Sequence, residues 1–152
     1  MTKIIFICEG NICRSPMAEF IFKNMLDKAN MAKDFDVTSR ATILDTNGQG
    51  FYSKAKEQLI KHQIPFTDHL ASQITIQEFR NADYIIGMEN YNLVLLKRAI
   101  FIRDESKLHC LLDFTDTKRD ISDPYYTRDF DKAYEDISYG CEGLLKYFKN
   151  KK

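Results

Sequence analysis

The chain has 152 residues, 44% of them hydrophobic and 12% aromatic, a size and composition typical of one domain with a buried core. Its 22 basic and 22 acidic residues balance, which argues against a dedicated nucleic-acid-binding protein, because such proteins usually carry a basic excess. No run of about 18 apolar residues predicts a transmembrane helix, and the first apolar run is too short for a signal peptide. We therefore expect a single cytoplasmic domain, 1–152, with reduced cysteines and without nucleic-acid or membrane partners.

The first half of the chain alternates between strand and helix patterns. Residues 4–7 form a continuous apolar, β-branched run typical of a strand that is buried on both faces. Ser15 and Pro16 predict a helix start, with Ser15 as the N-cap and Pro16 at the first helical position, and apolar residues follow at helical spacing. Residues 36–42 predict a second strand, and 46–50 a loop.

The second half continues this alternation. Thr75 and Glu78 have the spacing of a helix capping box. The remaining patterns predict helices over 53–63, 91–99 and 129–149, strands over 83–88 and 107–112, and a long polar segment over 113–128. Strands that alternate with helices predict an α/β fold with a parallel sheet covered on both faces. Ligands bind such sheets at the carboxyl ends of the strands, and the loop after the first strand lies at such an end.

This loop, Cys8-Glu9-Gly10-Asn11-Ile12-Cys13-Arg14-Ser15, combines groups that suit an anion. Gly10 and Asn11 tolerate unusual backbone angles, so successive N–H groups can point inward and form a nest. The helix N-terminus adds its own free donors, and Arg14 adds a planar fork for two phosphate oxygens. The loop therefore predicts a site for a tetrahedral dianion, with the Cys8 sulfur beneath it.

The same groups favour an ionised thiol. Helix N-termini and neighbouring cations stabilise cysteine thiolates, so we expect Cys8 to act as a nucleophile on a bound phosphoryl group. A phosphate ester also needs a proton for its leaving group, and Asp123, which precedes Pro124 and two tyrosines, is the candidate donor. The alternatives are a buried structural cysteine beside a surface arginine, and an ordinary Asp-Pro turn.

Together the two segments resemble the low-molecular-weight protein tyrosine phosphatases. The signature Cys-x5-Arg-Ser-Pro corresponds to residues 8–16 and Asp-Pro-Tyr-Tyr to 123–126, and the likeness continues through 67–75 and 88–93. The resemblance implies a four-stranded parallel sheet with helices on both faces and a phosphate-binding loop between the first strand and the first helix. It also implies a hydrolase that acts on phosphotyrosine-containing proteins through a phosphocysteine intermediate and releases inorganic phosphate.

The resemblance also implies a role for each site residue. Cys8 is the nucleophile, Arg14 holds the phosphoryl oxygens, and Asp123 protonates the tyrosyl oxygen and later activates water. Ser15 stabilises the thiolate. The residues that would contact the substrate are Glu9, Gly10, Asn11, Ile12, Cys13, Ser15 and Tyr125, with Tyr125 as one wall of the slot. Asn11, Ser15, Ser39 and His69 would form the hydrogen-bond network that supports the loop. Neither a cofactor nor a metal is expected, and we expect a monomer.

Several positions depart from the family pattern or add to it. Cys13 matches a position that forms a reversible disulfide with the nucleophile under oxidation. Glu9 stands where the family usually has an apolar residue, and the segment around Asp45 lacks an aromatic residue often found on the other wall of the slot. These differences predict a more acidic and more open slot that disfavours phosphopeptides with acidic flanks.

Three alternative functions differ in the residues that they require. A protein-arginine phosphatase of the same fold tends to have threonine where Ile12 stands, whereas an apolar residue there accompanies phosphotyrosine activity. An arsenate reductase of this fold needs two further cysteines in the middle of the chain, and residues 15–109 contain none. A non-catalytic phosphate-binding module would not need Cys8 and Asp123. The sequence leaves open the physiological substrate and whether Tyr125 or Tyr126 is itself phosphorylated.

Overall fold

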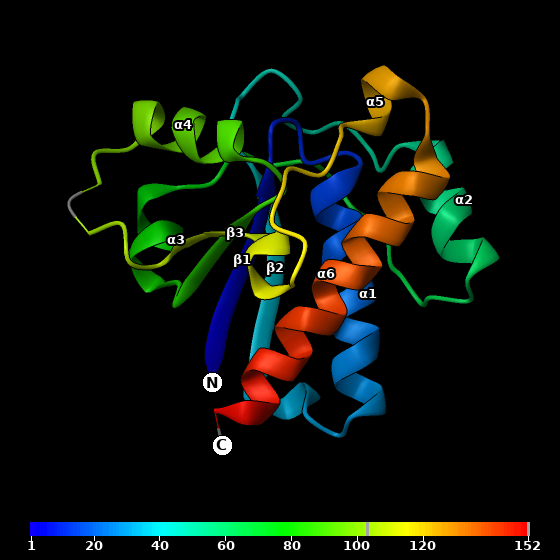
Figure 1. The fold of residues 1–152 in the computed structure, drawn as a ribbon. Coiled ribbons are helices and arrows are strands. Elements are labelled where there is room, and N and C mark those ends of the chain that lie inside the picture. Colours follow the sequence, from blue (N-terminus) through cyan, green and yellow to red (C-terminus); the bar gives the residue numbers. More distant parts are fainter. Residues whose placement is uncertain (103, 152) are drawn as a thin grey trace.

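Parallel strands run through the centre of the molecule, shown in Figure 1 for a computed structural model that describes residues 1–102 and 104–151. Over these residues the sheet has four strands in the order β2-β1-β3-β4, and every neighbouring pair is parallel. The strands are β1 (Thr2–Cys8), β2 (Phe35–Ala41), β3 (Tyr84–Gly87) and β4 (Leu108–Cys110). The predicted four-stranded α/β fold is confirmed.

Helices cover both faces of this sheet. They are α1 (Arg14–Lys28), α2 (Ser53–Lys61), α3 (Ile76–Asn81), α4 (Asn90–Ala99), α5 (Pro124–Thr127) and α6 (Phe130–Asn150), with 3-10 turns η1 (Ala32–Asp34) and η2 (Leu111–Phe114). Figure 1 shows α1, α2 and α6 on one side of the sheet and α3 and α4 on the other. Among the described residues, two separate apolar clusters match these two layers, one around α1 and α6 and a smaller one under α3 and α4.

Strand β1 supplies side chains to both clusters. Ile4 and Phe6 belong to the larger cluster, while Ile5 and Ile7 belong to the smaller one, because successive side chains of a strand point to opposite faces. All four are at most 6% exposed. This explains why the run reads as continuously apolar, and it fixes β1 as a central strand, as the sequence predicted.

The start of α1 differs from the prediction. The helix begins at Arg14 with Cys13 as its N-cap, so Ser15 lies inside the first turn and is not the cap. The physical reason is that the Ser15 hydroxyl has other partners: it contacts the Cys8 sulfur and accepts a hydrogen bond from the Asn11 amide. A residue type that caps helices is used here to hold a loop.

Other element boundaries shift by smaller amounts. The strand predicted over 107–112 ends at Cys110 because the chain turns into η2, and the polar segment 113–128 contains the short helix α5, which the sequence pattern did not predict. The capping box of Thr75 and Glu78 is confirmed, with hydrogen bonds in both directions. Among the described residues, no helix is both long and apolar enough to cross a membrane.

The strand order determines where a ligand can bind. The chain passes from β1 to β2 on one side and then crosses back to β3 on the other, so the order reverses at β1. Open parallel sheets bind ligands at the carboxyl end of the strands at such a reversal. The loop from Cys8 to Arg14 lies at this end, while Met1 and the end of α6 lie at the opposite end of the sheet (Figure 1).

Candidate active site

The loop after β1 folds around the sulfur atom of Cys8. Asn11 adopts the left-handed conformation, with φ of 57°, which asparagine tolerates better than most residues. This conformation turns the Asn11 backbone N–H back toward the Cys8 Sγ, at 3.2 Å. The Ser15 Oγ lies 3.0 Å from the same sulfur. Two polar groups of the chain therefore contact a side chain that is only 3% exposed.

The direction of the Ser15 contact follows from its other partner. The Asn11 Nδ2 donates to the Ser15 Oγ at 2.8 Å, and an amide nitrogen cannot accept in return. Because this bond uses a lone pair of the hydroxyl oxygen, the hydroxyl proton is free to point at the Cys8 sulfur. Both groups that contact the sulfur then act as donors, which is the arrangement that stabilises a thiolate.

The orientation of the Asn11 amide is set in turn by two groups from the loop before α3. The Ser72 N–H donates to Asn11 Oδ1 at 3.3 Å, which identifies this atom as the oxygen. The Nε2 atom of His69 lies 2.9 Å from the Asn11 carbonyl oxygen and 3.1 Å from Oδ1. Both are acceptors, so His69 carries its proton on Nε2. Burial lowers the pKa of His69 and favours this neutral form.

Arg14 points into the same cavity from the first turn of α1 and is only 1% exposed. Its Nη1 donates to the Ile121 carbonyl at 2.7 Å, while Nη2 lies 3.3 Å from Asp123 Oδ2 and 3.5 Å from Glu89 Oε1. Burial opposes the arginine charge, but the neighbouring Cys8, Asp123 and Glu89 outweigh it and raise the pKa of Arg14. A fixed positive charge therefore lies beside the sulfur.

Asp123 reaches the cavity because it caps the short helix α5. Its Oδ1 accepts the backbone N–H of Tyr125 at 3.0 Å, which leaves Oδ2 on the side of Arg14. The two tyrosines that follow are exposed, Tyr125 by 46% and Tyr126 by 71%. Tyr125 packs edge-on against Tyr52, with ring centroids 5.6 Å apart. The Asp-Pro-Tyr-Tyr segment thus brings a carboxyl and two aromatic rings to one side of the cavity.

Cys13 shares the loop but not the environment of Cys8. It is equally buried, and burial together with the charges of Cys8 and Asp123 raises its pKa to about 12. Cys13 therefore stays a protonated thiol. Burial also raises the pKa of Cys110, to about 12, and that of Cys141. All four cysteines are free thiols in this structure.

The structure brings most of the predicted site residues to one cavity of about 170 Å³. Its lining includes Cys8, Glu9, Gly10, Asn11, Ile12, Cys13, Arg14, Asp123 and Tyr125. Ser15 lies just beneath, and His69 touches Asn11 from outside. The Ser39 hydroxyl instead donates to Glu19 Oε1 at 2.7 Å, and Glu19 pairs with Lys23 at 2.6 Å.

Sequence reasoning missed four residues of the cavity lining, Ile43, Thr46, Gln49 and Tyr126, and three groups that hold Arg14 or Asn11 in place. Glu89 contacts Arg14, the Ile121 carbonyl accepts from it, and the Ser72 N–H orients Asn11. Glu89 could have been found, because it follows β3, and the carboxyl ends of neighbouring parallel strands meet at one edge of the sheet. Ile121 and Ser72 act through backbone atoms, which residue types do not reveal.

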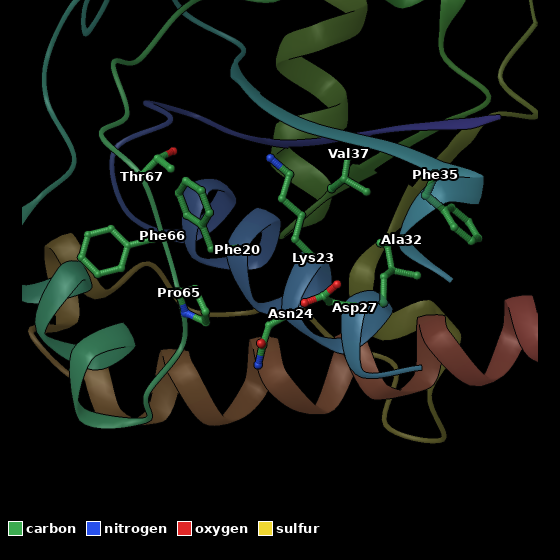
Figure 2. Close-up of a pocket in the computed structure, with 11 residues that line it drawn as sticks. Phe20, Lys23, Asn24, Asp27, Ala32, Phe35, Val37, Pro65, Phe66 and Thr67 are labelled. Carbon is green, nitrogen blue, oxygen red and sulfur yellow. The ribbon is translucent and has the colours of Figure 1, made fainter. Parts of the chain in front are cut away.

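A larger cavity, of about 470 Å³, lies between α1, β2 and the segment around Pro65 and Phe66. Figure 2 shows Phe20, Phe35 and Val37 among its walls, with Lys23 between Phe20 and Val37. None of its lining residues belongs to the loop from Cys8 to Arg14, and no cysteine lines it. The smaller cavity, which holds a thiol, an arginine and a carboxyl together, is therefore the candidate active site.

Comparison with known proteins agrees with this geometry. A protein-family model described as low molecular weight phosphotyrosine protein phosphatase matches residues 3–152. The low molecular weight protein-tyrosine-phosphatase YfkJ of Bacillus subtilis is 33% identical, over 100% of this chain and 99% of its own length. The phosphatase PtpA of Staphylococcus saprophyticus is 36% identical, over 97% of this chain and 94% of its own.

Solved structures give the same result. The crystal structure of YfkJ from Bacillus subtilis superposes with a TM-score of 0.95, covering 100% of this chain and 97% of that one. The crystal structure of a Drosophila arginine phosphatase has a TM-score of 0.88 at 32% identity, covering 97% and 98% of the two chains. Since the family match spans nearly every residue and the relatives match end to end, the chain belongs to the low molecular weight protein-tyrosine phosphatase family.

Proposed function

We propose that this chain hydrolyses phosphotyrosine in proteins through a phosphocysteine intermediate. The observation that supports this most directly is the Cys8 sulfur, held by two donors from Asn11 and Ser15 in the cavity that also contains Arg14 and Asp123. A nucleophile, a fixed cation and an acid thus occupy one site, which is the set that phosphoryl transfer requires without a metal.

Binding would use the charge at the bottom of the cavity. The loop N–H groups and the Arg14 guanidinium are the donors for the three non-bridging oxygens of the phosphate dianion. Arg14 is already held in place by the Ile121 carbonyl and by two carboxylates, so little of its freedom is lost when the substrate binds. The phosphorus atom then lies above the Cys8 sulfur.

In the first step the Cys8 thiolate attacks phosphorus, a sulfur–phosphorus bond forms, and the bond to the tyrosyl oxygen breaks. The leaving tyrosyl oxygen takes a proton from the Asp123 carboxyl. Asp123 is suited to this because the Tyr125 N–H fixes one carboxylate oxygen while the other faces the cavity. Tyrosine leaves as a neutral phenol.

In the second step water attacks the phosphocysteine. Asp123, now ionised, accepts the proton of the water, the sulfur–phosphorus bond breaks, and inorganic phosphate is released. Cys8 leaves as a thiolate, so the hydroxyl of Ser15 and the N–H of Asn11 lower the barrier by stabilising this leaving group.

The oligomeric state, the cellular location and the substrate-binding wall are inferred together with this chemistry. We infer that the enzyme acts as a monomer in the cytoplasm on phosphotyrosine-containing proteins, where a free thiol such as Cys8 stays reduced. The exposed ring of Tyr125 at the mouth of the cavity would form one wall against the substrate ring.

A protein-arginine phosphatase is the second candidate, because the solved Drosophila arginine phosphatase shares this fold closely. Ile12 argues for phosphotyrosine instead. It is a half-buried apolar side chain on the cavity wall, whereas a guanidinium substrate needs polar partners.

One assay separates the two candidates. Purified protein without added metal is given matched peptides that carry phosphotyrosine or phosphoarginine, and released phosphate is measured. We expect the phosphotyrosine peptide to have the higher kcat/KM by at least tenfold. A preference for phosphoarginine would replace the proposed function with the second candidate, and hydrolysis of neither would leave only phosphate binding.

A further inference from the structure

We propose that Glu9 selects phosphotyrosine segments that carry lysine or arginine next to the phosphotyrosine and disfavours segments with acidic flanks. This inference rests on the proposed phosphotyrosine phosphatase activity and names the class of substrate within it. It concerns one residue of the loop, which lines the active-site cavity and takes no part in the chemical steps above.

The backbone around Glu9 is held on both sides, which fixes where its side chain emerges. The Ile43 N–H donates to the Glu9 carbonyl at 3.3 Å and the Thr42 N–H to the Cys8 carbonyl at 3.1 Å. The Thr46 hydroxyl donates to the Gly10 carbonyl at 2.6 Å. Glu9 is therefore a half-buried, rigidly mounted residue between the nucleophile and the loop that follows β2.

No cation of the described chain neutralises this carboxylate. Among residues 1–102 and 104–151, Glu9 has no ion pair and no side-chain hydrogen bond. Arg14 is the cation that lines the cavity, but it is 1% exposed and already contacts Asp123 and Glu89. Arg128 instead packs over the Tyr52 ring, 5.6 Å from its centroid. The Glu9 charge is left for a ligand.

The field of Glu9 extends across the mouth of the cavity. Tyr126 lies on the wall formed by the Asp-Pro-Tyr-Tyr segment. The negative charge of Glu9 is the main cause that raises the pKa of the Tyr126 phenol, and slight burial and Asp123 add to it. Glu9 and Asp123 both line the cavity, so its wall carries negative charge, while Arg14 places positive charge at the bottom.

These two charges act on different parts of a substrate. The phosphate dianion reaches Arg14 at the bottom, while residues beside the phosphotyrosine stay at the mouth, within reach of Glu9 for a side chain as long as lysine. Each solvent-exposed ion pair of this kind changes binding affinity by about two- to fivefold. Dissolved salt screens such a pair over roughly 10 Å at 0.1 M. Charges at a binding rim act mainly on specificity and association.

The test compares three phosphotyrosine peptides that differ in two flanking residues only: two lysines, two glutamines or two glutamates. For the wild-type enzyme at low salt we expect kcat/KM for the lysine peptide to exceed that for the glutamate peptide by about tenfold. The ratio should fall toward one at 0.5 M salt. In Glu9→Gln the ratio should fall at least threefold, and in Glu9→Lys the preference should reverse.

The matched control is Glu142→Gln, which removes the same charge from an exposed position of α6 away from the cavity and should keep the wild-type ratio. A wild-type ratio of one or less, or an equal ratio in wild type and Glu9→Gln, overturns the inference. If circular dichroism shows that a Glu9 variant is unfolded, the inference is tested by the wild-type kcat/KM ratio and its salt dependence. Failure of the wild-type enzyme on the glutamine peptide would instead refute the proposed function.

Discussion

The bottom of the active-site cavity and its rim are built in opposite ways. The bottom consists of Cys8, Asn11, Arg14 and Ser15, and the rim of Glu9, Tyr125 and Tyr126. Every bottom residue is at most 3% exposed and is held through its side chain by another group of the chain. The rim tyrosines are 46% and 71% exposed, and the Glu9 carboxylate has no partner among the described residues.

This difference separates two tasks. Groups that must be in place before the phosphate arrives cost little when it binds, because the protein has already ordered them. Groups at the rim keep exposed rings and an unpaired charge, so they can contact the residues that surround the phosphate. Changes at the bottom should therefore lower turnover on every substrate, whereas changes at the rim should act on some substrates and spare others.

Cys8→Ser should have the largest effect. It replaces the nucleophile with a hydroxyl that is not ionised at neutral pH, while the loop and Arg14 can still bind the anion. We expect kcat to fall by at least about 10⁴-fold on all substrates, as for the loss of a nucleophile in other enzymes. Isothermal titration with phosphate should still show binding. Residual turnover above one part in a hundred would mean that another group carries the reaction.

Asp123→Asn should come next and should depend on the leaving group. Asparagine can still cap α5 by accepting the Tyr125 N–H, so the geometry is kept while the proton is lost. General acid catalysis increases reaction rates by about 10²–10⁴-fold, and we expect kcat on a phosphotyrosine peptide to fall by a factor in this range. The loss on para-nitrophenyl phosphate should be much smaller, because its phenol leaves without help. Equal losses on both substrates would exclude Asp123 as the acid.

Ser15→Ala removes one of the two donors to the Cys8 sulfur and leaves the Asn11 amide without its acceptor. A hydrogen bond to a charged group is worth about 1.5–3 kcal/mol, which corresponds to a loss of roughly 10- to 150-fold in kcat. Alkylation of Cys8 by iodoacetate should need a higher pH than in wild type. An unchanged alkylation profile would show that the hydroxyl does not stabilise the thiolate.

The contrast between bottom and rim also describes what the sequence could predict. Cys8, Arg14 and the loop between them were predicted because their chemistry is encoded in one short segment after a strand that reads as central. Asp123 was a candidate acid from its neighbours Pro124 and the two tyrosines, but an ordinary Asp-Pro turn stayed open until the family resemblance implied its role. The parallel sheet followed from the alternation of apolar patterns, and its helices from spacing and caps.

The other site contacts could not be predicted, because residue types do not reveal them. The Ile121 carbonyl and the Ser72 N–H are backbone atoms brought to the site by the fold, from segments far from the loop in sequence. Ser15 was assigned to a cap because local rules favour it there, but tertiary contacts with Cys8 and Asn11 took its hydroxyl. The N-cap prediction for Ser15 was therefore wrong, because the active site uses the hydroxyl that would have capped the helix.

At the rim, Tyr125→Ala should mainly weaken binding of phosphotyrosine peptides. The Tyr125 ring lines the cavity mouth and packs edge-on against Tyr52, which fixes it as a wall. Aromatic pairs are worth about 0.5–1.5 kcal/mol, so we expect KM to rise about two- to tenfold with kcat changed less. An alkyl phosphate, which has no ring to pack, should show no such rise. Equal changes for alkyl and aryl substrates would mean that Tyr125 acts through Asp123 and not through the substrate.

Cys13→Ser should change turnover least, by no more than about twofold, because the Cys13 thiol is protonated at neutral pH and contributes no charge. Its effect should appear after oxidation. Peroxide converts the Cys8 thiolate to a sulfenic acid, and a neighbouring thiol can condense with it to a disulfide and water, which a thiol reductant then reverses. We expect wild type to regain activity in dithiothreitol after peroxide treatment and Cys13→Ser to regain markedly less. Cys141→Ser, which removes another buried thiol from α6, is the control, and equal recovery in all three proteins would show that Cys13 does not protect Cys8.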